Sequence, residues 1–306
     1  MPPIDAVTSV VGPVKSRASL VAAFNQPRGR LIVLARYVKT HRAMQIGLLI
    51  VIGYAVLAVL APLIVPYRPD TSTSDTLQPP SLRHLFGTDV SGFDILSRVL
   101  FAPRVDITIA LTATLLALAI GTPLGVLAGF SRGLVSEIVS RVFDLIQAFP
   151  FFVLAMTLLA VLGPSVVNLI VVVAVVNAPI YLRLVKSQTL YLRERTFVQA
   201  ARVAGNSEFS LMFRHLFPNA LPPVLAQVSI NVAWAVILTA GVSFVGAGVR
   251  APTPEWGLMI SAGASNMFSG QWWVALFPGA ALALSTLGYA LIADGLRDLA
   301  DPTRAR

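Results

Sequence analysis

Five stretches without a charged residue dominate this chain, and each is long enough to hold a membrane-spanning helix. They cover residues 43–67, 107–131, 145–182, 216–249 and 256–293. A helix of about 20 apolar residues crosses the ~30 Å hydrocarbon core of a bilayer. The mean hydropathy of +0.78 points the same way. The first, second and fourth stretches each predict one span.

The other two stretches need a further division. The third is too long for a single helix and is interrupted at residues 162–165, "LGPS". Gly and Pro allow a tight reversal there, which predicts a hairpin of two short spans. The fifth predicts an interfacial segment and then a last span over about residues 274–292. We therefore expect an all-α membrane protein with six transmembrane helices.

These spans set the boundaries expected along the chain. They are a basic N-terminal segment with the lead-in to the first span (1–43), the first transmembrane helix (44–65), an extracytoplasmic loop (66–103), a five-helix core (104–298) and a C-terminal tail (299–306). Residues 1–43 lack the apolar core of a secretory signal peptide, so we expect no cleaved leader. Within the loop, apolar residues at helical spacing predict a short amphipathic helix on the outer membrane surface. They are Ile95, Leu96, Val99 and Leu100.

The distribution of basic residues predicts the orientation. Of the 23 Lys and Arg residues, 18 lie in segments on the same side of the membrane as the N-terminus and 5 on the other side. Because Lys and Arg accumulate in cytoplasmic loops, we expect a multi-pass protein of the cell (inner or plasma) membrane with both termini in the cytoplasm. This topology accounts for the net charge of +9 without nucleic-acid binding.

A polar segment interrupts the apolar sequence at residues 199–223, "QAARVAGNSEFSLMFRHLFPNALPP". It lies in the longest cytoplasmic loop, 186–220. A first helix is expected to end at Gly205, which suits a left-handed C-cap. Asn206 or Ser207 can cap a second helix, which Pro218 is expected to stop. The second helix would carry one apolar face, made of Phe209, Met212, Phe213 and Leu216.

Two interpretations of this segment follow from its periodicity. It is either an amphipathic helix lying on the inner leaflet or a plug that fits a cleft in a partner. Its spacing adds a third observation. Gln199-Ala200-Ala201, three residues, Gly205, nine residues and then a stretch ending in Pro218 resembles the "EAA" loop of ABC-importer permeases.

Further blocks extend this resemblance from about residue 44 to 304. "QPPSLRHLFGTD", "SGFDILSR", "LGPSVVNLI", "SFVGAGVRAPTPEWG" and "DGLRDLADPTR" occur in the order found in the C-type permease subunit of dipeptide and oligopeptide ABC importers. Three residues depart from the pattern. Gln199 stands where the motif usually has Glu, Phe93 replaces the usual Arg, and Thr239 stands where relatives often have Glu.

The resemblance implies a type I ABC importer permease fold with a cytoplasmic coupling-helix (EAA) loop. It also implies a transmembrane subunit forming half of a pathway for di- or oligopeptides or similar small solutes. The implied partners are a B-type permease subunit, two cytoplasmic ABC ATPases that carry ATP–Mg, an extracytoplasmic solute-binding protein and membrane lipid. The ATPase-coupling residues carried over are Gln199, Ala200, Ala201, Arg202, Gly205, Asn206 and Glu208.

Two other residue sets are assigned in the same way. Contact with the solute-binding protein is expected of Asp89, Asp94, Arg98, Pro254 and Trp256, although these loops could instead form a self-contained structural lid. Lining of the pathway is expected of Asn168, Asn177, Asn231 and Ser243. For any one of these four, a hydrogen bond to a neighbouring helix is the alternative role.

Several chemistries find no support in the sequence. No Gly-Lys-[Ser/Thr] P-loop, His-Glu-x-x-His zinc motif or cysteine occurs. We therefore expect no catalytic residue, no metal site and no cofactor on this chain. The alternative function is a gradient-driven transporter or channel with an interfacial cytoplasmic helix. Such carriers place ionisable residues deep in the bilayer, whereas the charges nearest the spans are expected near span ends. They are Asp106, Arg141, Asp144, Arg183 and Asp294, with Arg141 and Asp144 forming a local pair.

Overall fold

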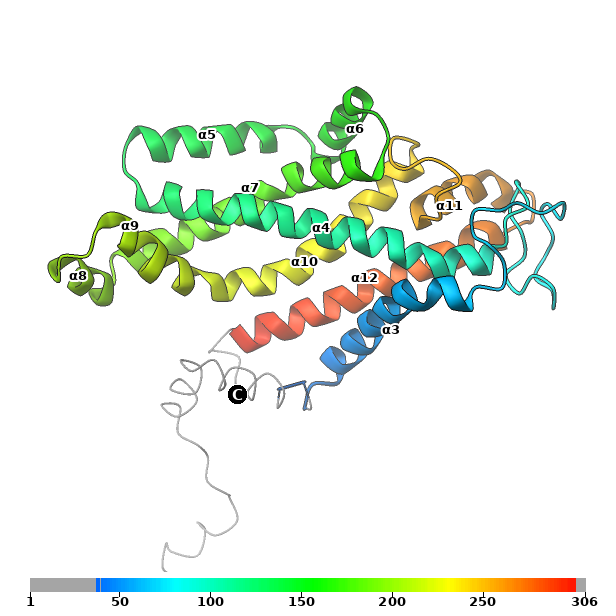
Figure 1. Cartoon of the computed structure of the whole chain (residues 1–306), viewed down its shortest axis with the longest axis horizontal. Helices are drawn as coiled ribbons and strands as arrows, with labels where there is room; N and C mark the ends of the chain where they lie inside the picture. The colour runs from blue at the N-terminus through cyan, green and yellow to red at the C-terminus, as the bar shows by residue number, and fades with distance from the viewer. Residues whose placement is uncertain (1–36, 39, 301–306) are drawn as a thin grey trace, which may run out of the picture.

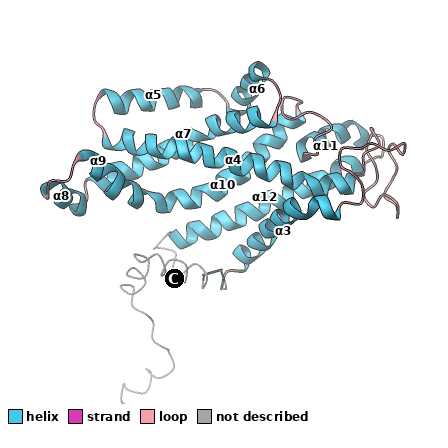
Figure 2. Ribbon diagram, in the orientation of Figure 1, coloured by secondary structure: helices cyan, strands magenta, loops and turns pink. Residues whose placement is uncertain are grey.

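The computed structural model describes residues 37, 38 and 40–300 as a bundle of helices (Figure 1). Most of the expected N-terminal segment 1–43 and most of the tail 299–306 lie outside the described residues. Figure 2 shows helices and loops with no strand in the described part of the chain. The helices are α3 (Arg42–Ile64), α4 (Ile95–Phe130), α5 (Leu134–Ala148), α6 (Phe151–Leu162), α7 (Val166–Arg193), α8 (Thr196–Val203), α9 (Glu208–Ser210), the π-helix η2 (Leu211–Leu216), α10 (Phe217–Phe244), α11 (Trp256–Ala264), the 3₁₀ turn η3 (Ser265–Met267) and α12 (Trp273–Ala300).

Five of these helices are long and apolar enough to cross a membrane: α3, α4, α7, α10 and α12. A sixth span results when α5 and α6, which meet at an angle of 91°, are taken together as one broken span. The chain is therefore a multi-pass membrane protein with the all-helical architecture that the apolar stretches predict.

The third apolar stretch folds differently from the predicted hairpin of two short spans. The helix does break at the predicted place, where Gly163 has a φ of 86° and Ser165 caps α7. However, α6 pairs with α5, which starts at Leu134 within a charged region, and α7 continues to Arg193. The charge-free run 145–182 did not predict where α5 begins or where α7 ends, because both helices carry charged side chains outside that run. A charge-free run marks only the most apolar part of a span.

The expected amphipathic helix on the outer membrane surface is also wrong. Residues from Ile95 onward form the first turns of α4, which continues through Pro103 without a break. A proline leaves the carbonyl four residues earlier without its helical N–H donor. Here that carbonyl belongs to Val99, and it accepts the indole N–H of Trp256 at 3.4 Å. Ile95 and Val99 are buried, so their apolar stripe faces protein and not lipid headgroups.

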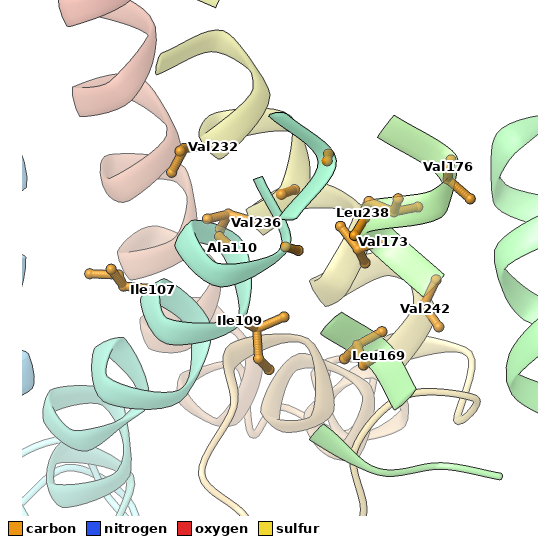
Figure 3. Packing of buried hydrophobic residues seen from close by; sticks show 14 of the residues in the cluster. Ile107, Ile109, Ala110, Leu169, Val173, Val176, Val232, Val236, Leu238 and Val242 are labelled. Atoms are coloured by element: carbon orange, nitrogen blue, oxygen red, sulfur yellow. The ribbon is translucent and has the colours of Figure 1, made fainter. Parts of the chain in front are cut away.

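The core lies where α4, α7 and α10 meet. Figure 3 shows Ala110 of α4 beside Val236 of α10, with Val173 and Leu169 of α7 close by. The α4–α7 contact is the most extensive helix pair. The backbones of α4 and α7 approach so closely at Gly125 that a Cβ there would lie only 2.7 Å from the Leu182 carbonyl oxygen. Small residues allow this kind of close helix packing in membranes.

The two loop regions singled out by the sequence lie at opposite ends of the bundle. In Figure 1, α8 and α9 project from one end, and the 65–94 loop lies with α11 at the other. Each region is therefore a separate candidate site.

Candidate functional site

We call residues 196–216, which comprise α8, α9 and η2, the α8–η2 segment. Its α8 helix ends as predicted at Gly205, which has a φ of 82°. The Gly205 N–H bonds to the Arg202 carbonyl at 3.0 Å and the Asn206 N–H to the Ala201 carbonyl at 3.2 Å. This pair of bonds is a Schellman motif, and the left-handed residue in it favours glycine. The Asn206 side chain adds a bond to the Ala201 carbonyl at 2.9 Å, so the bend is firmly held.

A small separate core anchors the segment to the bundle. Val198 of α8 and both Leu211 and Leu216 of η2 are fully buried and pack with Phe130 at the end of α4. In a π-helix, hydrogen bonds run from residue i to i+5, so residues five apart lie on one side. This explains how Leu211 and Leu216 both face inward. The predicted apolar face is therefore only partly formed, because Leu216 turns inward with Leu211 while Phe209 and Phe213 are exposed.

The predicted stop at Pro218 is also wrong. Residues 208–244 form one uninterrupted helical rod, in which α9 and η2 lead directly into α10. Pro218 is the second residue of α10 and directly follows the π-helical turn η2. The α8–η2 segment is consequently continuous with a membrane-spanning helix.

The outward face of the segment combines charged and apolar side chains. Arg202 and Glu208 bridge the bend with an ion pair at 3.3 Å. Gln199, Ala200 and Gly205 are exposed, whereas Ala201 and Asn206 are half-buried. Beside them, large apolar side chains face solvent, with Val203 90% exposed and Phe209 69% exposed. Sequence reasoning placed Phe209 on an apolar face but did not select Phe197 or Val203, since their spacing alone does not show that they face outward.

At the opposite end, a buried histidine joins the 65–94 loop to α4. Asp94 is the N-cap of α4 and accepts the backbone N–H of Ser97 at 2.8 Å. Its other oxygen bonds to Nδ1 of His84 at 2.8 Å. His84 is 2% exposed, its ring lies tilted against that of Tyr67 with the centroids 4.8 Å apart, and its Nε2 is 3.6 Å from Asp75. This cluster fixes the loop onto the helix end.

Arg98 connects two loops that are distant in sequence. Its guanidinium donates to the Pro69 carbonyl at 3.1 Å and to the Thr253 carbonyl at 3.3 Å. The Phe93 ring lies 4.4 Å from the guanidinium carbon, a favourable cation–π distance. Phe93, a departure from the family pattern, thus supports Arg98.

Two carboxyl groups meet where α11 begins. Glu255 caps α11 and accepts the N–H groups of Gly257 and Leu258 at 2.9 and 2.7 Å. Asp106 of α4 accepts the N–H of Trp256 at 3.2 Å. Burial raises the pKa of Glu255, and its two backbone N–H bonds offset only part of this rise. Asp106 is buried within α4, directly before the charge-free run 107–131, so its place near a span end stays a prediction.

These positions bear on the residues expected to touch a solute-binding protein. Asp94, Arg98, Pro254 and Trp256 are buried in this conformation and hold the loops together. Asp89 is half-buried; burial raises its pKa, and backbone N–H groups including that of Phe93 lower it in part. Contact by these five residues therefore stays a prediction, and the structural-lid alternative fits the four buried ones.

The residues expected to line a pathway lie mainly in the bundle interior. Asn168 is the exception, because it donates to the carbonyls of Leu162 and Gly163 at the α6–α7 turn. Asn177, Asn231 and Ser243 are fully buried. Neither side-chain heteroatom of Asn177 has a hydrogen-bond partner, and the Asn231 Oδ1 accepts from Gln227 at 2.9 Å. A lining role stays untested for all four.

The expected local pair of Arg141 and Asp144 does not form. Asp144 pairs with Arg183 of α7 at 2.8 Å, and Arg141 lies 3.8 Å from Glu137 one turn earlier. Within the described ranges, no group of three or more His, Asp or Glu side chains is placed to hold a metal ion.

Comparisons with known proteins agree with this architecture. Residues 121–306 match the family described as binding-protein-dependent transport system inner membrane component. Residues 33–80 match the N-terminal transmembrane domain of oligopeptide transport permease C.

Individual relatives match over most of their length. A dipeptide transport system permease protein of Alkalihalophilus pseudofirmus is 38% identical over 268 residues, which cover 87% of this chain and 88% of the relative. A probable D,D-dipeptide transport system permease protein of Escherichia coli K12 is 40% identical over 81% of this chain and 86% of the relative. A glutathione transport system permease protein of Pectobacterium atrosepticum is 35% identical over 87% and 89%.

Proposed function

Because this chain belongs to the family of binding-protein-dependent transport system inner membrane components, we propose that it is the C-type permease subunit of an ATP-driven importer for di- or oligopeptides. Named relatives that carry dipeptides, D,D-dipeptides and glutathione support a peptide-like substrate. The chain would form half of the pathway together with a paralogous B-type permease subunit. Both termini would lie in the cytoplasm, as the excess of basic residues on that side predicts.

The α8–η2 segment is proposed to dock into a cytoplasmic ABC ATPase, one of two that bind ATP–Mg and hydrolyse ATP for the complex. The exposed side chains of Val203 and Phe209 support this role. Exposed apolar groups at the end of a bundle favour burial against a partner. This chain itself is a non-catalytic subunit.

The helical continuity of residues 208–244 carries the proposal. When the ATPases close on ATP, they would pull the α8–η2 segment. Since the segment has its own core and the Gly205 bend is held by backbone hydrogen bonds, it would move as a unit and take α10 with it. Such rigid-body movement is how packed elements switch between two states, here inward-facing and outward-facing.

At the outer end, a solute-binding protein is proposed to deliver substrate to the 65–94 loop and the loop before α11. Asp89 offers a partly accessible acidic contact. In the bundle, Asn177 and Asn231 are proposed to meet the peptide backbone when the pathway opens. The unpaired amide of Asn177 and the unpaired Nδ2 of Asn231 could then replace hydrogen bonds that the substrate loses on leaving water.

The first test is Gly205→Glu in the full chain, co-expressed with its partner subunits. A side chain at a φ of 82° costs about 1–2 kcal/mol, and the new carboxylate would face the ATPase surface. We expect the variant to insert in the membrane. In a pull-down it should retain about tenfold less ATPase than the wild type, or less still, and a tenfold loss corresponds to about 1.4 kcal/mol of binding free energy.

Gly246→Glu is the matched control. Gly246 has a φ of 88°, makes the same pair of Schellman bonds, and lies at the opposite end of α10. A Cβ at either glycine meets no atom within 4 Å, so the two variants differ in position only. Equal ATPase retention by both variants would exclude coupling through the α8–η2 segment and favour a gradient-driven transporter with an interfacial helix.

A further inference from the structure

A basic cavity lies between the turn that follows α4 and the last turns of α7, next to α5. Its volume is about 540 Å³. Four basic side chains from three parts of the chain line it: Arg132 of the 131–133 turn, Arg141 of α5, and Lys186 and Arg193 of α7. Basic residues are common at the cytoplasmic end of membrane proteins. That rule does not explain why four basic side chains converge on one cavity.

The acidic side chains in the cavity wall do not neutralise this charge. Glu137 lies 3.8 Å from Arg141, which itself belongs to the wall. Asp144 pairs at 2.8 Å with Arg183, which does not line the cavity. Among the described residues, neither Arg132 nor Lys186 has an acidic partner. The cavity therefore keeps two cations that an anion could bind.

Lys186 is the better placed of the two. It is half-buried, and its Nζ donates to the Ser140 hydroxyl of α5 at 2.7 Å, which leaves its other protons for a ligand. A partly desolvated ammonium group without a counter-charge is unfavourable unless an anion pairs with it. Arg193 is held nearby by the Gly129 carbonyl at 3.1 Å and by Glu194.

We propose that this cavity binds the phosphate group of an anionic ligand. Guanidinium forks and a lysine ammonium match the oxygens of a phosphate, and Ser136 and Ser140 supply hydroxyl groups in the same wall. The phosphate belongs either to the headgroup of an anionic phospholipid or to a soluble phosphate compound. This site goes beyond the permease function and does not rest on it.

One feature favours the lipid source. On α5, Leu134, Ile138 and Val142 are exposed at a spacing of four residues, and they form an apolar stripe beside the charged side chains of the same helix. Acyl chains could lie along this stripe while the headgroup enters the cavity.

A second cavity places the ligand next to the α8–η2 segment. It has a volume of about 370 Å³, shares Arg132 and Arg193 with the first cavity, and reaches Gln199, Arg202 and Glu208. A phosphate bound in the first cavity would therefore lie beside Arg132 and Arg193, which also line the second cavity. That second cavity contains Arg202 and Glu208, whose ion pair bridges the Gly205 bend.

The test uses the full chain purified in detergent, with three probes: phosphatidylglycerol, phosphatidylcholine and inorganic phosphate. Lipid retention is measured by native mass spectrometry, and phosphate binding by the shift in melting temperature. The variants are Arg132→Gln and Lys186→Gln. The control is Arg214→Gln, which removes one charge from exposed η2 outside both cavities. Arg132 is exposed and unpaired, so its loss should leave folding unaffected.

We expect preferential retention of phosphatidylglycerol over phosphatidylcholine and a loss of about fivefold in affinity for each cavity cation removed, with little change for the control. Binding of inorganic phosphate without lipid preference, lost in the same variants, would support the site and assign it to a soluble ligand. Equal retention of both lipids with no phosphate binding overturns the proposal. So does a loss that is the same for Arg214→Gln as for the two cavity variants.

Discussion

Glu255 and Asp106 are two carboxyl residues that meet where α11 begins. Both are buried, both accept N–H groups of the first turn of α11, and they lie side by side. Two adjacent carboxyl groups cannot both ionise without a large cost. Burial raises the pKa of Glu255, so the folded protein binds a proton there more readily than the unfolded chain does.

The sign of the pH dependence follows from that raised pKa. Its contribution to stability is fully present below the ordinary pKa of Glu, about 4.3, and is lost as pH rises through the higher pKa of the folded state. We expect the melting temperature of the purified protein to fall across this window and Glu255→Gln to flatten the fall. The variant keeps one oxygen for the N–H groups at the start of α11 but cannot ionise. A pH profile unchanged by Glu255→Gln would contradict this assignment.

His84 is a second residue whose burial predicts a measurable effect. Replacing it with Ala leaves Asp94 without its 2.8 Å partner in a buried site, at a cost of about 1–3 kcal/mol. We expect faster proteolysis within the 65–94 loop. Arg83→Ala is the comparison, because Arg83 forms a 2.9 Å ion pair with Asp75 but is 73% exposed, and surface pairs contribute about 0–1 kcal/mol. Equal protease sensitivity of both variants would refute a structural role for His84.

Among the elements, α8 has two valines in opposite environments. Val198 is fully buried in the small core with Leu211 and Leu216, and Val203 is 90% exposed. Val198→Ala should weaken α8 packing by about 1–3 kcal/mol, which hydrogen exchange of the α8 amides would detect. Val203→Ala should leave that exchange unchanged and reduce ATPase retention instead. Altered α8 exchange in Val203→Ala would show that this side chain stabilises the segment.

The same segment shows how hydrogen-bond geometry overrides helical periodicity. A period of 3.6 residues grouped Phe209, Met212, Phe213 and Leu216 on one face, whereas the π-helical turn of η2 brings Leu211 and Leu216 together inside. Phe209 and Phe213 are left on the outside. The two exposed phenylalanines are thus separated from Leu216, with which the α-helical period had grouped them.

For the whole molecule, the most extensive helix contact is the close approach of α4 and α7. A Cβ at Gly125 would lie 2.7 Å from the Leu182 carbonyl oxygen and 2.8 Å from the Val185 Cβ. Gly125→Val should therefore force the helices apart, at about 1–3 kcal/mol for an overpacked core, and lower the melting temperature of the purified protein. Gly279→Val is the control, since a Cβ there meets no atom within 4 Å. Similar melting temperatures for the two variants would contradict this packing.

The sequence by itself determined the features that depend on local chemistry. Charge-free runs predicted the membrane helices, because lipid excludes charged groups and unpaired backbone alike. Gly205 predicted the end of α8, because a left-handed residue favours glycine at any helix end. The motif order predicted the family that the comparisons show.

Only the tertiary structure decided which side chains face outward and which groups meet. Asp144 pairs with Arg183, 39 residues away, and not with Arg141 on its own helix. Arg98 bonds to Thr253, 155 residues away, and Asp106 to Trp256, 150 residues away. Local propensity cannot encode such pairs, because they arise from how helices pack. Burial of Val198 and exposure of Val203 likewise depend on η2 and α4 lying against one side of α8.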